Sequence, residues 1–489
     1  MSVVNPQSTG TRRYEQQLAR AMGVLGNICV TVSGITPTAS IFIIAPVAFA
    51  NQGSGTFLAF IIAAVIGLGM GMCYAELGTA FPIAGGQYSI IARVLGRSVG
   101  FLAFADYLVL TVFVPSSIAL GAGQYVALLW PGVNNANLIG LIIMLATTVI
   151  AIFHIRTNAF VTGVFLAIEL LAVGTMSILG FTHIHQPLSI LFQPQKVDPH
   201  GVFSPLSLGL LLAGVSTAIF AYNGYDSPII YSEEMSGPRR GVAKAVFWSL
   251  GITIVAELVP VTAALLGAPS LAALSASPTP MSYVLTALGG NVLNALVLVG
   301  VLCAIFNGTI AILLSYGRVL YSSGRDKTWP EPISRWLAAT HPRFKSPWVA
   351  TALLGIVGGL LTYFSNVATL VTFTGVLLVV LYGLVALAAL VSRVRQRNLV
   401  RPYRMPWWPL WPVIGLAGCV IVFTQQALTD MSICAAIFLV AAVYYLIYLR
   451  PRKATHWVML DPASSDEAGE QAEEAMAGGS TVGPLQSEA

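Results

Sequence analysis

The stretch T-V-S-G-I-T-P-T-A-S, residues 31–40, interrupts the first apolar segment of the chain, which covers residues 22–50. Thr36 followed by Pro37 is typical of a helix start, with Thr as N-cap and Pro at the first helical position. The sequence therefore predicts that Ser33-Gly34-Ile35 is an unwound joint between two half-helices. At membrane depth, non-helical backbone is tolerated only where it is buried in protein or lines a hydrated cavity.

The composition predicts that the chain lies in a membrane. Only 9% of its 489 residues are charged and its mean hydropathy is +0.80, whereas soluble globular proteins carry about 25% charged residues. Runs of about 20 apolar residues predict twelve spans in an all-α integral membrane protein. The expected spans are 22–50, 56–79, 98–129, 136–155, 158–181, 206–235, 241–267, 291–322, 346–363, 366–392, 410–428 and 431–449.

The distribution of basic residues predicts the orientation. If the N-terminus is cytoplasmic, Lys196 is the one residue among 24 Lys and Arg that falls on the outer side. Loops on the cytoplasmic side are enriched in Lys and Arg, so we expect both termini to be cytoplasmic and the protein to lie in the plasma (inner) membrane. The net charge of +5 then reflects this asymmetry and does not indicate nucleic-acid binding.

A second interruption of the same kind lies in the sixth span, at I-F-A-Y-N-G-Y-D-S-P, residues 219–228. Gly34 and Gly224 are 190 positions apart, which is about five helices with their loops. Because five is odd, the second copy enters the membrane from the opposite side. Broken helices 1 and 6 in a 5+5 inverted repeat indicate the central site of a carrier. Two ordinary proline kinks are the alternative reading, since Gly and Pro are frequent in membrane helices.

The repeat defines the expected domains. Residues 1–21 form a cytoplasmic N-terminal segment, 22–205 the first five-helix repeat with an external loop, and 206–392 the second repeat. Helices 11 and 12 occupy 393–449. Residues 450–489 form a cytoplasmic tail, which we expect to be disordered because from Asp461 it carries seven acids and no base.

The two interruptions suit a zwitterion. Half-helices that begin at Pro37 and Pro228 would point free N–H groups at the membrane midplane, where partial positive charge favours a carboxylate. The backbone of residues 33–35 would hold that carboxylate. The preceding half-helices would end in free carbonyls near Thr31 and near residues 220–222, which suit an ammonium group or a metal cation.

Several motifs, taken in order, resemble those of amino acid–polyamine–organocation transporters, which have the five-plus-five fold of bacterial leucine transporters. The resemblance covers about residues 15–450. It implies that Ser33, Gly34 and Ile35 bind the substrate carboxylate. It also implies that the carbonyls of Phe220, Ala221 and Tyr222 bind the amine, with Tyr225 as a lid; Thr36, Gly224 and Asp226 complete the candidate binding set. The motifs are S-G-I-T at 33–36, Y-A-E-L-G at 74–78, F-P-I-A-G-G-Q-Y at 81–88, F-A-Y-N-G-Y-D at 220–226, E-E-M-S-G-P-R-R at 233–240 and R-V-L-Y-S-S-G-R-D at 318–326.

Five acids lie within the expected spans, and no Lys or Arg lies mid-span to pair with them. An unpaired carboxylate in a low-dielectric site favours its protonated form and can therefore take up and release protons. Each acid also has a structural alternative: Glu76 braces the following loop, Asp106 hydrogen-bonds between helices, and Glu257 satisfies backbone freed by the kink at Pro260. Asp226 caps the second half-helix or favours a cationic substrate.

The acid expected to couple transport to protons is Glu169, in the fifth span with apolar neighbours. The resemblance places it beside the first interruption, where some proton-coupled relatives carry a lysine and sodium-coupled relatives hold a cation. Asn307 and Thr309 in the eighth span would line the same position. In the alternative reading they complete a sodium site together with Glu169.

These observations predict a secondary active transporter of neutral or cationic amino acids that is proton-coupled and works by alternating access. A polyamine or amine transporter and an amino acid exchanger are the alternatives, and sodium coupling stays open. No His-Cys or nucleophile–base cluster supports an enzyme. The five cysteines lie in hydrophobic spans and indicate neither a disulfide nor a metal site. Beyond the coupling ion no cofactor is expected, and the expected partners are the small-molecule substrate and the lipid bilayer.

Overall fold

The computed structural model describes residues 13–14, 22–82, 85–130, 132–133, 135–153, 159–197, 202–232, 235, 239–344, 346–458 and 461–462. The chain divides into two units. One consists of residues 20–458, and the other of residues 1–19 and 459–489. In the second unit β1 (Arg13–Tyr14) pairs in parallel with β4 (Asp461–Pro462), with Arg13 opposite Asp461. The rest of the predicted disordered tail beyond residue 462 lies outside the described residues.

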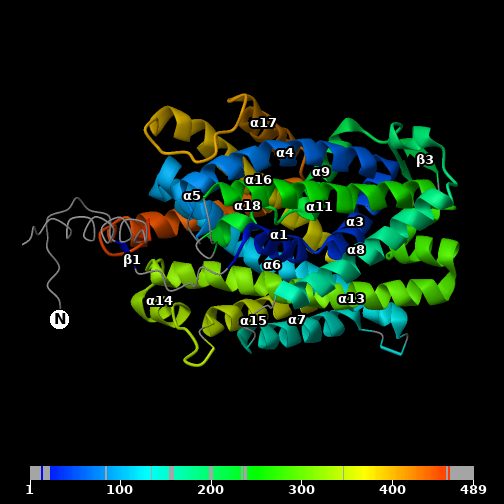
Figure 1. The fold of residues 1–489 in the computed structure, drawn as a ribbon, viewed down its shortest axis with the longest axis horizontal. Coiled ribbons are helices and arrows are strands. Elements are labelled where there is room, and N and C mark those ends of the chain that lie inside the picture. Colours follow the sequence, from blue (N-terminus) through cyan, green and yellow to red (C-terminus); the bar gives the residue numbers. More distant parts are fainter. Residues whose placement is uncertain are drawn as a thin grey trace, which may run out of the picture. The chain divides into compact units, whose positions relative to one another are not determined.

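Helices make up most of the larger unit (Figure 1). In chain order they are α1 (Val24–Ile35), α2 (Pro37–Ala39), the π-helix η1 (Ser40–Ile44), α3 (Ala45–Gln52), the 3-10 helix η2 (Gly53–Gly55), α4 (Thr56–Ala80), α5 (Gly86–Leu95), α6 (Arg97–Leu129), α7 (Ala136–Phe153), α8 (Ala159–Thr182), the 3-10 helix η3 (Leu188–Leu191), α9 (Leu208–Tyr222), α10 (Ser227–Ile230), α11 (Arg240–Gly267), α12 (Leu271–Ala276), α13 (Pro280–Arg325), α14 (Glu331–Leu337), α15 (Trp348–Phe364), α16 (Val367–Arg395), α17 (Leu410–Thr424), α18 (Leu428–Tyr444) and the π-helix η5 (Tyr445–Leu449).

The predicted helical membrane class is confirmed. Among the described residues, eight helical segments are long and apolar enough to cross a membrane, and three shorter apolar helices accompany them. The segment Val24–Ala80 contains two of the predicted spans. Within α13, Gly290 has non-helical backbone angles, directly before the expected start of the eighth span at residue 291. The number of twelve crossings stays a prediction.

The first interruption is real but lies later than predicted. Helix α1 continues to Ile35, so residues 33–35 are helical and the prediction of an unwound joint there is wrong. The break is Thr36, which has left-handed backbone angles (φ 55°, ψ 73°) and whose side chain makes no N-capping hydrogen bond to the helix that follows. Pro37 begins the next helix, as predicted, because its missing N–H removes the bond that would continue α1.

The second interruption is longer. Helix α9 ends at Tyr222, and residues 223–226 form a turn before the four-residue helix α10. Gly224 adopts φ 115°, which L side chains rarely reach, and its α-carbon faces Ile35: a Cβ placed there would lie 2.8 Å from Ile35 Cγ1. Glycine is required at this position both for its backbone angle and for this close approach. The two interruptions, distant in sequence, therefore lie side by side.

The broken helices lie within the bundle rather than at its surface. Helix α1 packs against α8, α11 and α13, while α3 and α4 pack against α9. Figure 1 shows α1 in dark blue in the middle of the view, between α11 and α13. Non-helical backbone is thus enclosed by protein, as membrane burial requires.

Three features depart from the predicted boundaries. The loop after α8, predicted to lack regular structure, contains an antiparallel pair of short strands, β2 (Gln195–Val197) with β3 (Phe203–Pro205). The segment 268–290 contains α12, which packs against α3.

The third departure from the predicted boundaries concerns residues 450–458. These residues are ordered and are not part of a disordered tail. Trp457 is buried against Tyr88, Phe101 and Phe104. The Arg97 guanidinium donates hydrogen bonds to the carbonyls of Lys453, His456 and Trp457. Burial of one large aromatic side chain orders this polar stretch.

Candidate functional site

A cavity lies where the two interruptions meet. The empty space in and around it amounts to about 520 Å³, part of which is open to solvent. Its walls come from α1, η1, α6, the α9–α10 turn and α13. The lining residues are Val30, Gly34, Ile35, Ser40, Ile44, Val114, Ile118, Phe220, Asn223, Gly224, Ser227, Tyr231, Ile312, Ser315 and Tyr316.

The cavity lining is mostly apolar, and no lining residue carries a charged side chain. Hydroxyl groups and one amide supply the polar part. Ser40 Oγ donates a hydrogen bond of 2.8 Å to the carbonyl of Ala221, which joins η1 to the last turn of α9. Tyr231 and Ser315 share a hydrogen bond of 2.5 Å. A site of this kind suits a small neutral or zwitterionic solute with an apolar part.

Both interruptions present helix C-termini to this cavity. Gly34 and Ile35 belong to the last turn of α1, and Phe220 to the last turn of α9. The last carbonyls of a helix lack partners within it and carry partial negative charge. The arrangement therefore suits an ammonium group. The amides of residues 33–35 point into the preceding turn of α1, so carboxylate binding by those amides would require that turn to unwind.

Four of the ten predicted binding residues line the cavity: Gly34, Ile35, Phe220 and Gly224. Ser33 accepts a hydrogen bond from Asn307 (3.1 Å), and the Ala221 carbonyl accepts from Ser40. Tyr222 packs edge-on against Phe60. These three residues lie behind the lining.

Tyr225 and Asp226 also lie outside the cavity lining. The ring of Tyr225, predicted to be a lid, packs edge-on against Tyr74 and Tyr382. Asp226 occupies the N-cap position of α10 without a capping hydrogen bond from its side chain. Its carboxylate instead accepts a hydrogen bond of 2.5 Å from Gln87 Nε2 on α5.

The sequence interpretation missed most of the polar lining. It named the backbone of the interruptions but not Ser40, Asn223 and Ser227, which stand within the same quoted motifs. It also missed Tyr231, Ser315 and Tyr316. The available signal was polar side chains inside apolar spans, which almost always face the protein interior.

Thr36 packs closely against a glycine of α13. A Cβ atom at Gly308 would overlap the Thr36 hydroxyl, so only a glycine lets the break approach this helix so closely. Thr36 Oγ1 donates to the Ser33 carbonyl (3.0 Å), which satisfies one C-terminal carbonyl of α1.

Replacing Gly308 with alanine is expected to lower the free energy of unfolding by about 1–3 kcal/mol, because the break has to shift to make room for the methyl group. Thermal unfolding of the purified protein in detergent measures this. Gly251→Ala is the matched control, since a Cβ there meets no heavy atom within 4 Å. Equal melting temperatures for the two variants would contradict the tight packing at Thr36.

Glu169 on α8 is directed at the first broken helix. Its Oε1 accepts a hydrogen bond from Thr38 Oγ1 (3.0 Å), and its Oε2 has no hydrogen-bond partner among the described residues. Asn307 bonds to Ser33, and Thr309 donates to the Ile305 carbonyl of its own helix. No hydrogen bond within the described part of the chain joins Glu169 to either of them.

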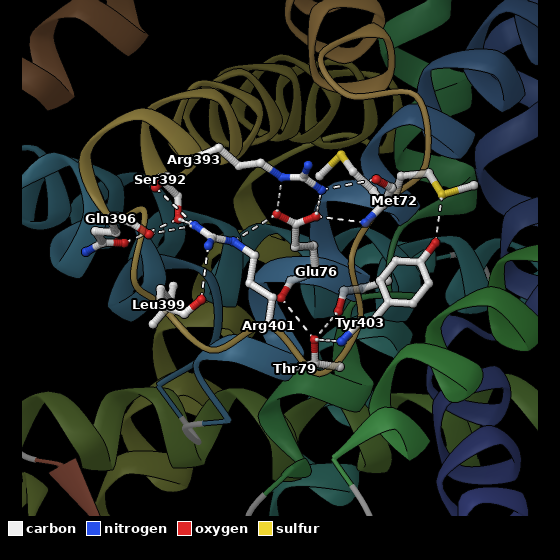
Figure 2. Close-up of polar contacts among 11 residues, drawn as sticks. Met72, Glu76, Thr79, Ser392, Arg393, Gln396, Leu399, Arg401 and Tyr403 are labelled. Carbon is white, nitrogen blue, oxygen red and sulfur yellow. Dashed lines mark hydrogen bonds and ion pairs between the residues drawn. The ribbon is translucent and has the colours of Figure 1, made fainter.

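Glu76 is paired, contrary to the expectation that the membrane acids lack partners (Figure 2). Arg393 binds its two oxygens at 2.8 and 2.5 Å, and Arg401 Nε lies 3.1 Å from Oε1. The amide of Met405 donates to Oε2. Glu76 therefore braces the loop between α16 and α17, not the loop after its own span. The bases come from the end of α16 and from that loop, which are distant in sequence.

The structural alternatives for two other acids are wrong. Neither carboxyl oxygen of Asp106 on α6 makes a hydrogen bond within the described residues, so it does not link helices that way. The same holds for Glu257 on α11, which does not satisfy backbone freed at Pro260. Both side chains are fully buried.

The amino acid permease family model matches residues 22–449, and the chain belongs to this family of membrane transporters, which has the leucine-transporter fold. An uncharacterized transporter of Mycobacterium tuberculosis is 28% identical over 436 residues, 89% of this chain and 92% of the relative. A branched-chain amino acid permease of Lactococcus lactis is 26% identical, over 82% of this chain and 88% of the relative. A methylthioribose transporter of Bacillus subtilis is 24% identical, over 90% and 96%. The protein is thus a transporter of amino acids or related solutes and not an enzyme.

Proposed function

We propose that the protein is a secondary active transporter of neutral amino acids with apolar side chains, bound in the cavity between the two interruptions. The observation that carries this proposal is the lining of that cavity: two helix C-termini, several hydroxyl groups, an aliphatic wall and no charged side chain. The uncharged lining favours neutral over cationic amino acids. The name of the Lactococcus lactis relative, a branched-chain amino acid permease, points the same way.

Each part of such a substrate has a complementary group. The carbonyl ends of α1 and α9 suit the ammonium group. The hydroxyl of Ser227 and the amide of Asn223 suit the carboxylate. The hydroxyls of Ser40 and Ser315 already donate to backbone carbonyls. The aliphatic wall suits the substrate side chain and consists of Val30, Ile44, Val114, Ile118 and Ile312.

Alternating access in this proposal uses a 5+5 inverted repeat of twelve spans with both termini cytoplasmic. The two adjacent interruptions support the repeat, because half-helices at matching positions of inverted repeats mark the site around which carriers rock. The basic loops support the orientation.

Competition in reconstituted liposomes tests the substrate class. Counterflow of labelled leucine is expected to be inhibited by neutral apolar amino acids, but neither by isoamylamine nor by isocaproate, which each lack one of the two charged groups. Inhibition by isoamylamine or by a polyamine would favour the amine-transporter alternative. Inhibition by methylthioribose alone would overturn the amino acid proposal in favour of the solute named for the Bacillus subtilis relative.

Coupling to protons is proposed to use Glu169. One of its oxygens holds Thr38, directly after the first break, and the other is buried without a partner. A lone buried carboxylate is costly in its ionised form, so this group is suited to carry a proton. Because it contacts the broken helix, its protonation would be coupled to rearrangement of that helix.

Glu169→Gln is expected to abolish accumulation driven by a proton gradient while counterflow of labelled substrate continues, because the amide keeps the Thr38 contact but cannot exchange a proton. Concentrative uptake into liposomes measures the loss. Undiminished proton-driven uptake in this variant would refute the role of Glu169. Uptake that requires a sodium gradient would support the sodium alternative.

A further inference from the structure

A second acid lies beside the cavity without an assigned role. Glu257, within α11, is fully buried, and both of its carboxyl oxygens lack hydrogen-bond partners among the described residues. Helix α11 packs against η1, and this contact brings the carboxyl group of Glu257 near the Ser40 hydroxyl, which donates to Ala221 and not to Glu257. The carboxyl group also lies near Tyr222. The Tyr222 hydroxyl is likewise buried without a partner.

Ser40 connects this acid to the cavity. Its side chain lines the cavity, its backbone begins η1 after the first break, and its hydroxyl donates to Ala221 in the last turn before the second break. One hydroxyl therefore contacts the cavity, both broken helices and the neighbourhood of Glu257.

We propose that Glu257 binds and releases a second proton of the transport cycle, and that Ser40 is the positioning residue that transmits its protonation state to the cavity. This inference rests on the proposed transport function. The proton comes from water that enters the cavity on one side of the membrane and leaves to water on the other side. No bond other than O–H forms or breaks.

The two protonation states of Glu257 place different demands on Ser40. A neutral carboxyl group can donate its proton to Ser40 Oγ, which leaves the hydrogen of Ser40 on the Ala221 carbonyl and η1 joined to α9. An ionised carboxylate needs donors, because burying it unpaired is costly. Ser40 has a single O–H, so donating it to Glu257 breaks the bond to Ala221 and releases η1 from α9.

The acids on the helices that neighbour α11 are engaged elsewhere. Glu169, on the neighbouring helix α8, is bonded to Thr38, and Glu76, on α4, is paired with two arginines. Tyr222 on α9 is the titratable side chain that interacts with Glu257. The titratable residue of α1, Cys29, is half-buried and free. Glu169 thus bonds to Thr38 and Glu257 lies near Ser40, so both acids face residues 38–40.

Infrared difference spectra of the purified protein test the proposal directly. On titration with alkali, without substrate, we expect a protonated carboxyl C=O band that disappears in Glu257→Gln and shifts in frequency in Ser40→Ala. The matched control is Asp106→Asn, another fully buried acid without hydrogen-bond partners that does not line the cavity. The band that Glu257→Gln removes is expected to be unchanged in this control.

Substrate binding gives the second readout. The dissociation constant of the transported amino acid is expected to lose part of its pH dependence in Glu257→Gln and in Ser40→Ala, and to keep it in Asp106→Asn. A pH profile in Glu257→Gln identical to that of the unmodified protein, with no titrating band removed, would overturn the proposal. The infrared titration needs no substrate, so it tests protonation of Glu257 even if the proposed transport function is wrong. Melting temperatures identify any variant that fails to fold, and Ser40→Ala then supplies the test.

Discussion

Replacing Gly34 with valine is expected to abolish substrate binding while the protein stays folded. Gly34 lines the cavity, and a Cβ atom placed on it meets no heavy atom within 4 Å. The added side chain therefore enters empty space that the substrate would occupy. Valine also has a better helix propensity than glycine, so the last turn of α1 is not weakened.

Binding of the transported amino acid to purified Gly34→Val, followed by thermal shift or calorimetry, measures this effect. Ligands that bind only the folded state raise its stability, so the loss appears as a missing shift. Gly174→Val on α8 is the matched control, since its Cβ also meets nothing within 4 Å and the residue does not line the cavity. Near-normal affinity in Gly34→Val would remove the cavity from consideration as the binding site.

Replacing Glu76 with glutamine is expected to lower the free energy of unfolding by about 3–5 kcal/mol, because removing one partner of a buried ion pair leaves the other charge uncompensated. The side chain of Glu76 is 1% exposed and that of Arg401 is 4% exposed. Two guanidinium groups would face each other without the carboxylate, and the α16–α17 loop would lose its anchor on α4 (Figure 2).

Chemical or thermal unfolding in detergent measures the effect of Glu76→Gln. Glu331→Gln provides the comparison, because Glu331 is 56% exposed and lies 4.0 Å from Lys327 and 3.8 Å from Arg335. An exposed pair of this kind is worth about 0–1 kcal/mol. Equal stability loss in the two variants would show that the cluster around Glu76 does not hold the loop.

Local sequence chemistry was sufficient to predict both interruptions, although it placed the first at residues 33–35 and not at Thr36. Pro37 starts a helix where its missing N–H predicts one, and Gly224 takes the positive φ that favours glycine. The exact end of α1 was not predictable. Thr36 can pack this closely against α13 because Gly308 has no side chain, and that contact joins residues distant in sequence.

The environment of the acids was the weakest part of the sequence interpretation. Hydropathy placed Glu76 and Glu257 alike inside spans, yet one is paired with two arginines and the other has no hydrogen-bond partner in the described region. The difference depends on a loop that folds back from the end of α16. The ordering of residues 450–458 was unpredictable for the same reason, because it depends on residues distant in sequence. Trp457 orders this polar stretch by packing against an aromatic cluster on α5 and α6.

An experimental density map of the protein with a bound neutral amino acid tests the central claim most directly. The account predicts one ligand in the cavity between Thr36 and Gly224, with its amino group at the carbonyl ends of α1 and α9 and its side chain against the aliphatic wall. Ligand density outside that cavity, or helices wound without interruption through both stretches, would contradict it.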